Sequence, residues 1–492
     1  MPGRPELQSR ATWVIALALA TGACTTAGPN FETPAPPQGA AAVGYAMKGD
    51  ATPPGVRLDP VASPNGPWWR ALGLAGLDEV MQLALANNQG LAEANAALER
   101  AQAEADSARG QQRLQADLNA SARKTRINSK LFGFSGFTPP TIGLLSVGGN
   151  VNYDLDLFGA RRRATEQARA MVEVARHEAD AARLTLTANV ARQAMTIAAL
   201  RAQITAIEAV IADDRRIFEM VRAAQAEGGV PLSDLVLIYR QLTDSEASLP
   251  RLQKDLASAR HQLALLVGRA PAEWTPPDFA LDPAQAVADV PVALPSALVR
   301  TRPDILAAEA ELHAATAAIG IAQANRYPDI RLTATLTQTA TTPEGLFGYS
   351  GSGWNLFSGL SAPVFNGGTL KARQRAAEAE ARVALARYQS TVLRAFVQVS
   401  DALSAASSDH AELEADRRSL AAEEGKLRTA HAAYDLGGAS LRQVVEVQQL
   451  VNRARQTVAR SQGQYDLDMI RLYAAVASDW RTSAQTVAAA KP

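Results

Sequence analysis

Two long stretches of the chain lack nearly all of the residues that interrupt helices. Residues 160–227 contain no glycine and no proline, and residues 369–436 contain no proline and the single glycine Gly425. Because an α-helix rises 1.5 Å per residue, each stretch predicts a helix roughly 100 Å long. Helices of this length are typical of coiled coils rather than of ordinary globular domains.

Each long stretch ends in a glycine pair, after which a second helical run begins. The pairs are Gly228-Gly229 and Gly437-Gly438. Apolar residues then recur every seven positions, at Leu235, Leu242, Leu249, Leu256 and Leu263 in the first run and at Val444, Val451, Val458, Tyr465 and Leu472 in the second. This period predicts coiled-coil hairpins with the glycine pairs at their tips. Pro250 predicts a kink or a restart in the first returning helix.

The two heptad series are separated by a constant 209 residues, which predicts an internal duplication. "EGGVPLSDLVLIYRQL" aligns with "LGGASLRQVVEVQQLV" at this offset, and "GLAEANAALERAQAEA" aligns with "DILAAEAELHAATAAI" at an offset of 214. The change of offset places loops of different length in the two copies.

Four shorter segments alternate apolar and polar residues. They lie at about 113–123, 147–158, 328–338 and 354–365. Alternation over about ten residues is the signature of a transmembrane β-strand, although a half-buried soluble strand gives the same pattern. The smallest barrels need about eight strands, so a membrane location requires several chains to close one barrel.

These elements predict a mostly α fold with a small β part, built from two copies of one unit. Each copy comprises a helix, two strands, a long helix and a returning helix. The first copy spans 68–270 and the second 295–480, with a linker at 271–294 and a tail at 481–492. Residues 24–67 are rich in proline, glycine and alanine and predict an extended tether.

Residues 1–23 have the layout of a secretory signal peptide. Arg4 and Arg10 precede the apolar run 13–20, and Thr21-Gly22-Ala23 follow it. Cys24, the only cysteine in the chain, comes next. This is the arrangement of a bacterial lipoprotein, in which Cys24 becomes the first mature residue and carries acyl chains such as palmitate. Lipoprotein signals usually carry an aliphatic residue three positions before the cysteine, where this chain has Thr21. The alternative is an ordinary signal peptide followed by an incidental cysteine.

Composition and motifs exclude several classes of function. Lys+Arg and Asp+Glu both number 49, which argues against a nucleic-acid partner. No unbroken apolar run of the mature chain approaches 18 residues, so we expect no transmembrane helix. The five histidines lack metal-ligand spacing, and there is no P-loop, dinucleotide fingerprint or HExxH motif. We therefore expect no enzyme activity, no metal and no cofactor.

Several segments resemble the TolC-type outer membrane efflux family, in its lipoprotein branch of NodT-like and OprM-like proteins. They include "GPNFETP", "YDLDLFGARRRA", "LPSALVRTRPDILAAEAELHAATAAIGIAQANRYPDIRL" and "APVFNGGTLKA". The resemblance covers almost the whole chain. It implies a homotrimer with a 12-stranded β-barrel in the outer membrane and a helical α-barrel in the periplasm.

The resemblance also implies partners and a function. The partners are a periplasmic adaptor (membrane-fusion) protein, an inner-membrane pump of the resistance-nodulation-division (RND) type, and outer membrane lipid. The function is a passive exit duct for drugs or other small solutes. Two alternatives stay open: the exit channel of a type I protein secretion system, and a periplasmic coiled-coil lipoprotein scaffold without a pore.

A gate at the hairpin tips is the last implication of the resemblance. Aligned through Tyr434, Glu446 takes the position of an acidic pore-lining residue, and Gln443 stands where some members carry a second aspartate. Arg442 stands where the lipoprotein branch often has an aliphatic constriction, and Asp234 matches an aspartate that pairs across hairpins. Three copies of Glu446 around an axis would attract cations. The alternative is that these are solvated charges on helix surfaces.

Overall fold

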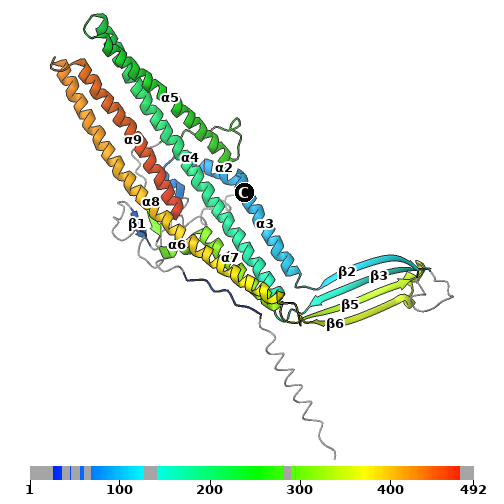
Figure 1. Cartoon of the computed structure of the whole chain (residues 1–492). Coiled ribbons are helices and arrows are strands. Elements are labelled where there is room, and N and C mark those ends of the chain that lie inside the picture. The colour runs from blue at the N-terminus through cyan, green and yellow to red at the C-terminus, as the bar shows by residue number, and fades with distance from the viewer. Residues whose placement is uncertain are drawn as a thin grey trace, which may run out of the picture. The chain divides into compact units, whose positions relative to one another are not determined.

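The chain forms two compact units, each assembled from distant parts of the sequence (Figure 1). The computed structural model describes residues 26–35, 45, 56–59, 68–126, 141–280, 290–293 and 295–476. The first unit comprises Met1–Pro34, Ala97–Ala175 and Ala307–Tyr388, and the second comprises Ala35–Ala96, Arg176–Leu306 and Gln389–Pro492. Cys24, the signal peptide and the predicted tail at 481–492 lie outside the described residues.

Two helices of equal length dominate the structure, as the glycine-free and proline-free stretches predicted. They are α4 (Ala160–Ala226) and α8 (Thr369–Asp435), with 67 residues each. The returning helices α5 (Leu232–Val267) and α9 (Leu441–Val476) have 36 residues each. Helix α5 continues through Pro250 without interruption. Of the two expected outcomes, a restart is therefore wrong and a kink stays a prediction; one missing N–H removes only a single hydrogen bond from a helix that packs along its length.

The second unit holds the hairpin tips and the core between the helices. It also contains helices η1 (Trp68–Leu72), α2 (Leu77–Asn87) and α6 (Pro295–Thr301), and a parallel pair of strands, β1 (Val56–Asp59) with β4 (Val290–Ala293). None of the ten heptad residues is exposed. Leu263, Val451 and Leu472 are fully buried. The seven-residue period thus marks the packed face of each returning helix.

The first unit carries a four-stranded antiparallel sheet. Most of α3 (Gln89–Gly110) and α7 (Pro303–Ala324) belongs to this unit. The strands are β2 (Gln115–Arg126), β3 (Thr141–Asp154), β5 (Asp329–Ala340) and β6 (Ser352–Ser361), in the order β2-β3-β5-β6. Short 3-10 turns, η3 (Glu344–Phe347) and η4 (Tyr349–Gly351), precede β6.

The ends of the strands differ from those predicted. Strand β3 begins at Thr141 and ends at Asp154, so Leu155 and Leu157 lie beyond it. Asp156 has φ 44°, a conformation that leaves the extended region and stops the strand. Strand β6 likewise ends before the predicted Val364. The apolar alternation continues past both ends, and after β3 the N–H of Leu155 still donates to a neighbouring strand, to Ile330 O of β5 at 3.0 Å.

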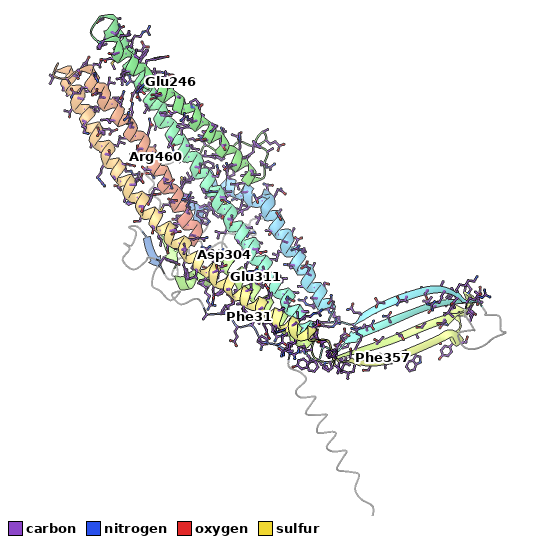
Figure 2. The ribbon with its side chains drawn as sticks, in the orientation of Figure 1. Phe31, Glu246, Asp304, Glu311, Phe357 and Arg460 are labelled. Carbon is purple, nitrogen blue, oxygen red and sulfur yellow. The ribbon has the colours of Figure 1, made fainter. Side chains whose placement is uncertain are left out.

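The register of the sheet separates apolar from polar side chains. Rows on one face are Ala116–Val151–Ala334–Leu356 and Leu118–Gly149–Leu336–Trp354. Rows on the other face are Asp117–Asn150–Thr335–Asn355 and Asn119–Gly148–Thr337–Gly353. Phe357 of β6, which pairs with Thr333 of β5, is an apolar exception on the polar face (Figure 2). In this single chain β2 and β6 are edge strands, and Leu118 and Trp354 are each 80% exposed.

Two helices have a higher mean hydropathy than the absence of long unbroken apolar runs indicated. Windows of 18 residues in α4 and α7 reach mean hydropathies of 1.4 and 1.3, which is sufficient by length and composition for a membrane span. Abundant alanine produces these values without an unbroken apolar run. Within α4, Val190, Ala194 and Ile197 are fully buried against the rest of the protein, as in the core helix of a folded domain.

Candidate functional site

Both hairpin tips close with the same backbone motif. At the first tip, Gly228 has φ 78° and its N–H donates to Gln225 O, while the N–H of Gly229 donates to Ala224 O at 2.8 Å. At the second tip, Gly437 has φ 73° and donates to Tyr434 O, and Gly438 donates to Ala433 O at 2.8 Å. This pair of bonds is a Schellman cap, which needs a left-handed residue and therefore favours glycine.

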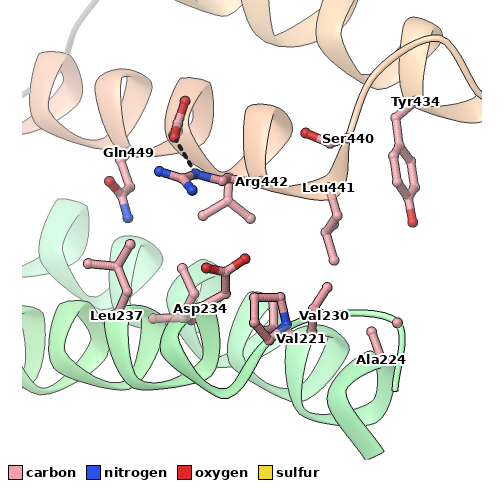
Figure 3. Close-up of a pocket in the computed structure, with 15 residues that line it drawn as sticks. Val221, Ala224, Val230, Asp234, Leu237, Tyr434, Ser440, Leu441, Arg442 and Gln449 are labelled. Carbon is pink, nitrogen blue, oxygen red and sulfur yellow. Dashed lines mark hydrogen bonds and ion pairs between the residues drawn. The ribbon is translucent and has the colours of Figure 1, made fainter. Parts of the chain in front are cut away.

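A cavity of ≈ 520 Å³ lies beside the two tips, within the second unit (Figure 3). Both hairpins line it. The first contributes Val221, Ala224, Gly229, Val230, Pro231, Asp234, Leu237 and Ile238, and the second contributes Tyr434, Ser440, Leu441, Arg442, Val445, Glu446 and Gln449. A cavity shared in this way changes shape if the hairpins move apart.

Apolar side chains hold the two hairpins together at this cavity. Ile217 and Val221 of α4, Ile238 of α5 and Val445 of α9 form one buried cluster. Leu441 packs against its margin. Because Val445 alone of the four buried members comes from the second hairpin, it inserts between the helices of the first. Burial of such side chains stabilises the contact by about 25 cal/mol per Å² of apolar surface removed from water.

Charged groups stand on the α9 and α5 sides of the same cavity. Arg442 Nε donates to Glu446 Oε1 at 3.0 Å, within one turn of α9. The Asp234 carboxylate points into the cavity towards α9 (Figure 3). The hydrogen bond to Glu446, the charge of Glu446 and the charge of Asp234 raise the pKa of Arg442 above its ordinary value. Each Glu446 therefore has a cation of its own chain beside it.

The structure brings together four of the five predicted gate side chains. Glu446, Arg442, Asp234 and Tyr434 all line the cavity. Gln443 does not; it is exposed, and its backbone N–H donates to Ser440 O at 3.1 Å at the start of α9. No pattern in the sequence indicated the apolar residues that line the same cavity, such as Val221, Leu237 and Val445.

A second network links the hairpins further along α4. Arg455 of α9 bonds Glu424 of α8 at 3.1 Å and lies 3.9 Å from Asp213 of α4. Gln448 Nε2 donates to Asp213 Oδ2 at 3.4 Å. Asp213 also accepts from Arg216 of its own helix at 3.3 Å, so it joins α4 to the second hairpin in a polar counterpart of the apolar cluster. Its residues are spread over three helices, so no local motif predicts it.

The sequence profile of the family described as "Outer membrane efflux protein" matches residues 80–269 and 294–478, which include both hairpins and all four strands of the sheet. The chain belongs to this family. It is a family of channel and transport proteins rather than of enzymes. Among the residues that the structure describes, no three His, Cys, Asp or Glu side chains are grouped as metal ligands.

The similarity to relatives in this family extends over nearly the whole length of both proteins. The chain is 27% identical over 444 residues to the pyoverdine export outer membrane protein OpmQ of Pseudomonas putida strain KT2440, covering 88% of this chain and 93% of OpmQ. It is 28% identical over 462 residues to the probable efflux pump outer membrane protein TtgC of the same strain, covering 92% of each. The fold resembles that of the Campylobacter jejuni CmeC outer membrane channel with a TM-score of 0.82, at 18% identity, over 94% of this chain and 98% of CmeC.

Proposed function

We propose that this protein is the outer membrane exit duct of a tripartite efflux pump. It passively conducts drugs or other small solutes that an inner-membrane RND pump delivers through a periplasmic adaptor. One observation carries the proposal: the β2-β3-β5-β6 sheet has one apolar face, one polar face and two unpaired edges. A sheet in lipid must leave no unpaired edge, so these strands complete a barrel with other copies of the chain.

Three chains supply the strands that such a barrel needs. Four strands from each of three chains give twelve, with Leu118 and Trp354 facing lipid and the Asn150 row facing the lumen. Two-fold repetition within the chain is supported by the paired helix lengths of 67 and 36 residues and by the two matched segments of the family profile. In this proposal the first copy spans 68–270 and the second spans 295–480, joined by the linker 271–294.

The N-terminus supplies an auxiliary anchor. Cys24 follows a signal-peptide layout and precedes the first described residue by two positions. Acylation of Cys24 predicts an intact mass above that of the unmodified chain starting at residue 24. An unmodified mass would exclude the lipid anchor and leave the duct proposal standing.

The tip cavity is the periplasmic gate of this duct. Closing it requires the two hairpins to stay packed through the Val445 cluster, and the Arg455 network acts in the same direction. Since Arg442 sits 3.0 Å from Glu446, each of these pairs carries little net charge, and the Asp234 carboxylate adds one negative charge per chain to the cavity. This changes the expectation of a ring set by Glu446 alone and predicts a cation preference that Arg442 weakens.

The duct is tested by reconstituting the purified protein in a planar bilayer. Discrete single-channel conductance, together with restored drug resistance in a host that lacks its own outer membrane channel, is the expected result. A folded protein that gives no conductance at any protein concentration would refute the duct and favour a scaffold.

Paired charge variants test the gate. Glu446→Gln leaves Arg442 without its partner and should shift selectivity towards anions, whereas Arg442→Ala should shift it towards cations. Glu219→Gln, an exposed carboxylate on α4 outside the cavity, is the matched control. Identical reversal potentials in all four proteins would show that neither residue lines the constriction.

A further inference from the structure

The segment that follows Cys24 is fastened to the first unit rather than free. Residues 26–34 belong to the predicted tether, yet the N–H of Ala27 donates to Phe158 O at 3.0 Å. Phe31 stacks on His313 of α7 with ring centroids 4.4 Å apart and an interplanar angle of 14° (Figure 2). Residues 26–32, which we name the strap, are the part of the predicted tether that packs on the first unit.

A buried arginine holds the strap. Arg163 is 3% exposed and donates Nε to Ala27 O at 3.1 Å, one terminal nitrogen to Gly28 O at 3.1 Å and Asn30 Oδ1 at 2.9 Å, and the other to Glu166 at 2.7 Å. Guanidinium offers donors in a fixed planar fork, so one side chain satisfies three acceptors of the strap at once. Glu166 balances the charge of Arg163.

Glycines allow the strap to lie directly on the helices. A Cβ on Gly320 of α7 would lie 2.8 Å from Ala27 O and 2.8 Å from the Arg163 side chain. Gly28 has φ 88°, and a Cβ there would lie 2.4 Å from the Cα of Gly320. The strap and α7 thus touch backbone to backbone, a contact that tolerates no side chain at either position.

The strap ends beside the base of the sheet. Thr26 contacts Gly159, five residues after the end of β3, because a Cβ on Gly159 would lie 2.7 Å from Thr26 Cγ2. Two peptide units separate Cys24 from Thr26, and an extended chain spans at most ~3.6 Å per residue. Any group on Cys24 is therefore attached within about 7 Å of that contact.

We propose that Arg163 is a positioning residue that latches the strap, so that the lipid on Cys24 tethers the strands themselves to the membrane while the barrel inserts. The inference rests on the proposed acylation of Cys24. A latched strap leaves a tether of two residues, and a released strap lengthens it at least to Ala35. Effective concentration falls with about the −3/2 power of tether length, so release should slow insertion on the order of tenfold.

The test measures how fast the full-length chain inserts in a Gram-negative host. Cells are pulse-labelled, and the half-time for acquiring resistance to added protease is followed for the original protein, Arg163→Ala and Gly320→Ala. Gly320→Ala removes no charge and favours the helix, and its Cβ would displace Ala27 and the Arg163 side chain while both Arg163 and Glu166 stay in the chain. Arg169→Ala, an exposed arginine on the same helix, is the matched control.

The decisive comparison repeats these variants in a chain that cannot be acylated. That chain carries Cys24→Ala behind a cleavable signal peptide of a non-lipoprotein. Arg163→Ala and Gly320→Ala should lengthen the half-time about tenfold in the acylated chain and by less than about twofold in the other. Equal slowing in both backgrounds would reduce Arg163 to a structural residue, and no slowing in the acylated chain would overturn the latch.

Failure of this inference and failure of the duct give different results. An original protein whose mass shows no acyl chain would overturn the latch, while its conductance would still report the duct. Variants that insert slowly should reach the original single-channel conductance once inserted, because the strap lies outside the tip cavity.

Discussion

Val445→Ala is the sharpest test of the tip cluster as the element that keeps the gate closed. Val445 is 5% exposed and packs with Ile217, Val221 and Ile238 of the other hairpin. The change removes two methyl groups, each worth about 0.8 kcal/mol when buried, so the contact between hairpins loses about 1.5 kcal/mol. If the hairpins separate on opening, this loss raises the open-to-closed ratio roughly tenfold, since 1.4 kcal/mol is a factor of ten.

Single-channel recording in planar bilayers measures that ratio as the fraction of time spent in the higher conductance level. Val236→Ala on α5 is the matched control, because Val236 is 59% exposed and the same two methyl groups are removed from solvent. Val445→Ala should increase the open fraction and Val236→Ala should leave it unchanged.

Two results would refute the reasoning. A Val445→Ala protein with lowered thermal stability and an unchanged open fraction would show that the cluster stabilises the fold without controlling the gate. An equal increase for both variants would show that the effect does not depend on burial between the hairpins.

Three further changes probe the core, the pH dependence and the sheet. Gly463→Val should lower the unfolding temperature at a cost of about 1–3 kcal/mol, because even a Cβ at Gly463 would lie 2.8 Å from Ala199 Cβ on α4. Burial raises the pKa of Asp466 to about 6, above its unfolded value near 3.8. The native state therefore binds the extra proton, and stability falls as pH rises from about 4 through about 6; Asp466→Asn should remove this fall, on the order of 3 kcal/mol, in unfolding measured across pH. Leu336→Arg should cost about 2–4 kcal/mol near the membrane midplane and reduce the inserted fraction, whereas Thr335→Arg on the opposite face should not.

Controls separate these effects from general damage. Gly425→Val on α8 adds the same bulk where no side chain or neighbouring backbone lies closer than 3.7 Å, so it should leave the unfolding temperature nearly unchanged. Asp255→Asn at an exposed position of α5 should keep the original pH profile. Equal effects of Leu336→Arg and Thr335→Arg would contradict the division of the sheet into a lipid face and a lumen face.

Much of the architecture follows from local signals in the chain. The long helices α4 and α8 end within one residue of the limits set by the absence of glycine and proline, since backbone continuity is a local property. Glycine pairs marked the tips because a Schellman cap needs a left-handed residue. The alternation in residues 328–338 located β5, since successive side chains in a strand point to opposite faces.

Other features depend on which segments meet. Tether composition gave no sign that Arg163, more than 130 residues away, binds Ala27, Gly28 and Asn30. Likewise, the seven-residue period located the packed face of α9 but did not reveal that Val445, next to the heptad position Val444, enters the cluster of the other hairpin.

The sequence by itself determined where helices and strands form and which face of each is apolar, because backbone capping, side-chain period and proline exclusion act over a few residues. Only the tertiary structure decided that Asp234 of α5 faces the Arg442–Glu446 pair of α9 (Figure 3), that the two hairpins share one cavity, and that Arg163 binds the strap. Those outcomes depend on charge pairing and close packing between segments far apart in the chain. Such contacts are set by the positions of the atoms in space, and a linear pattern of residue types does not contain them.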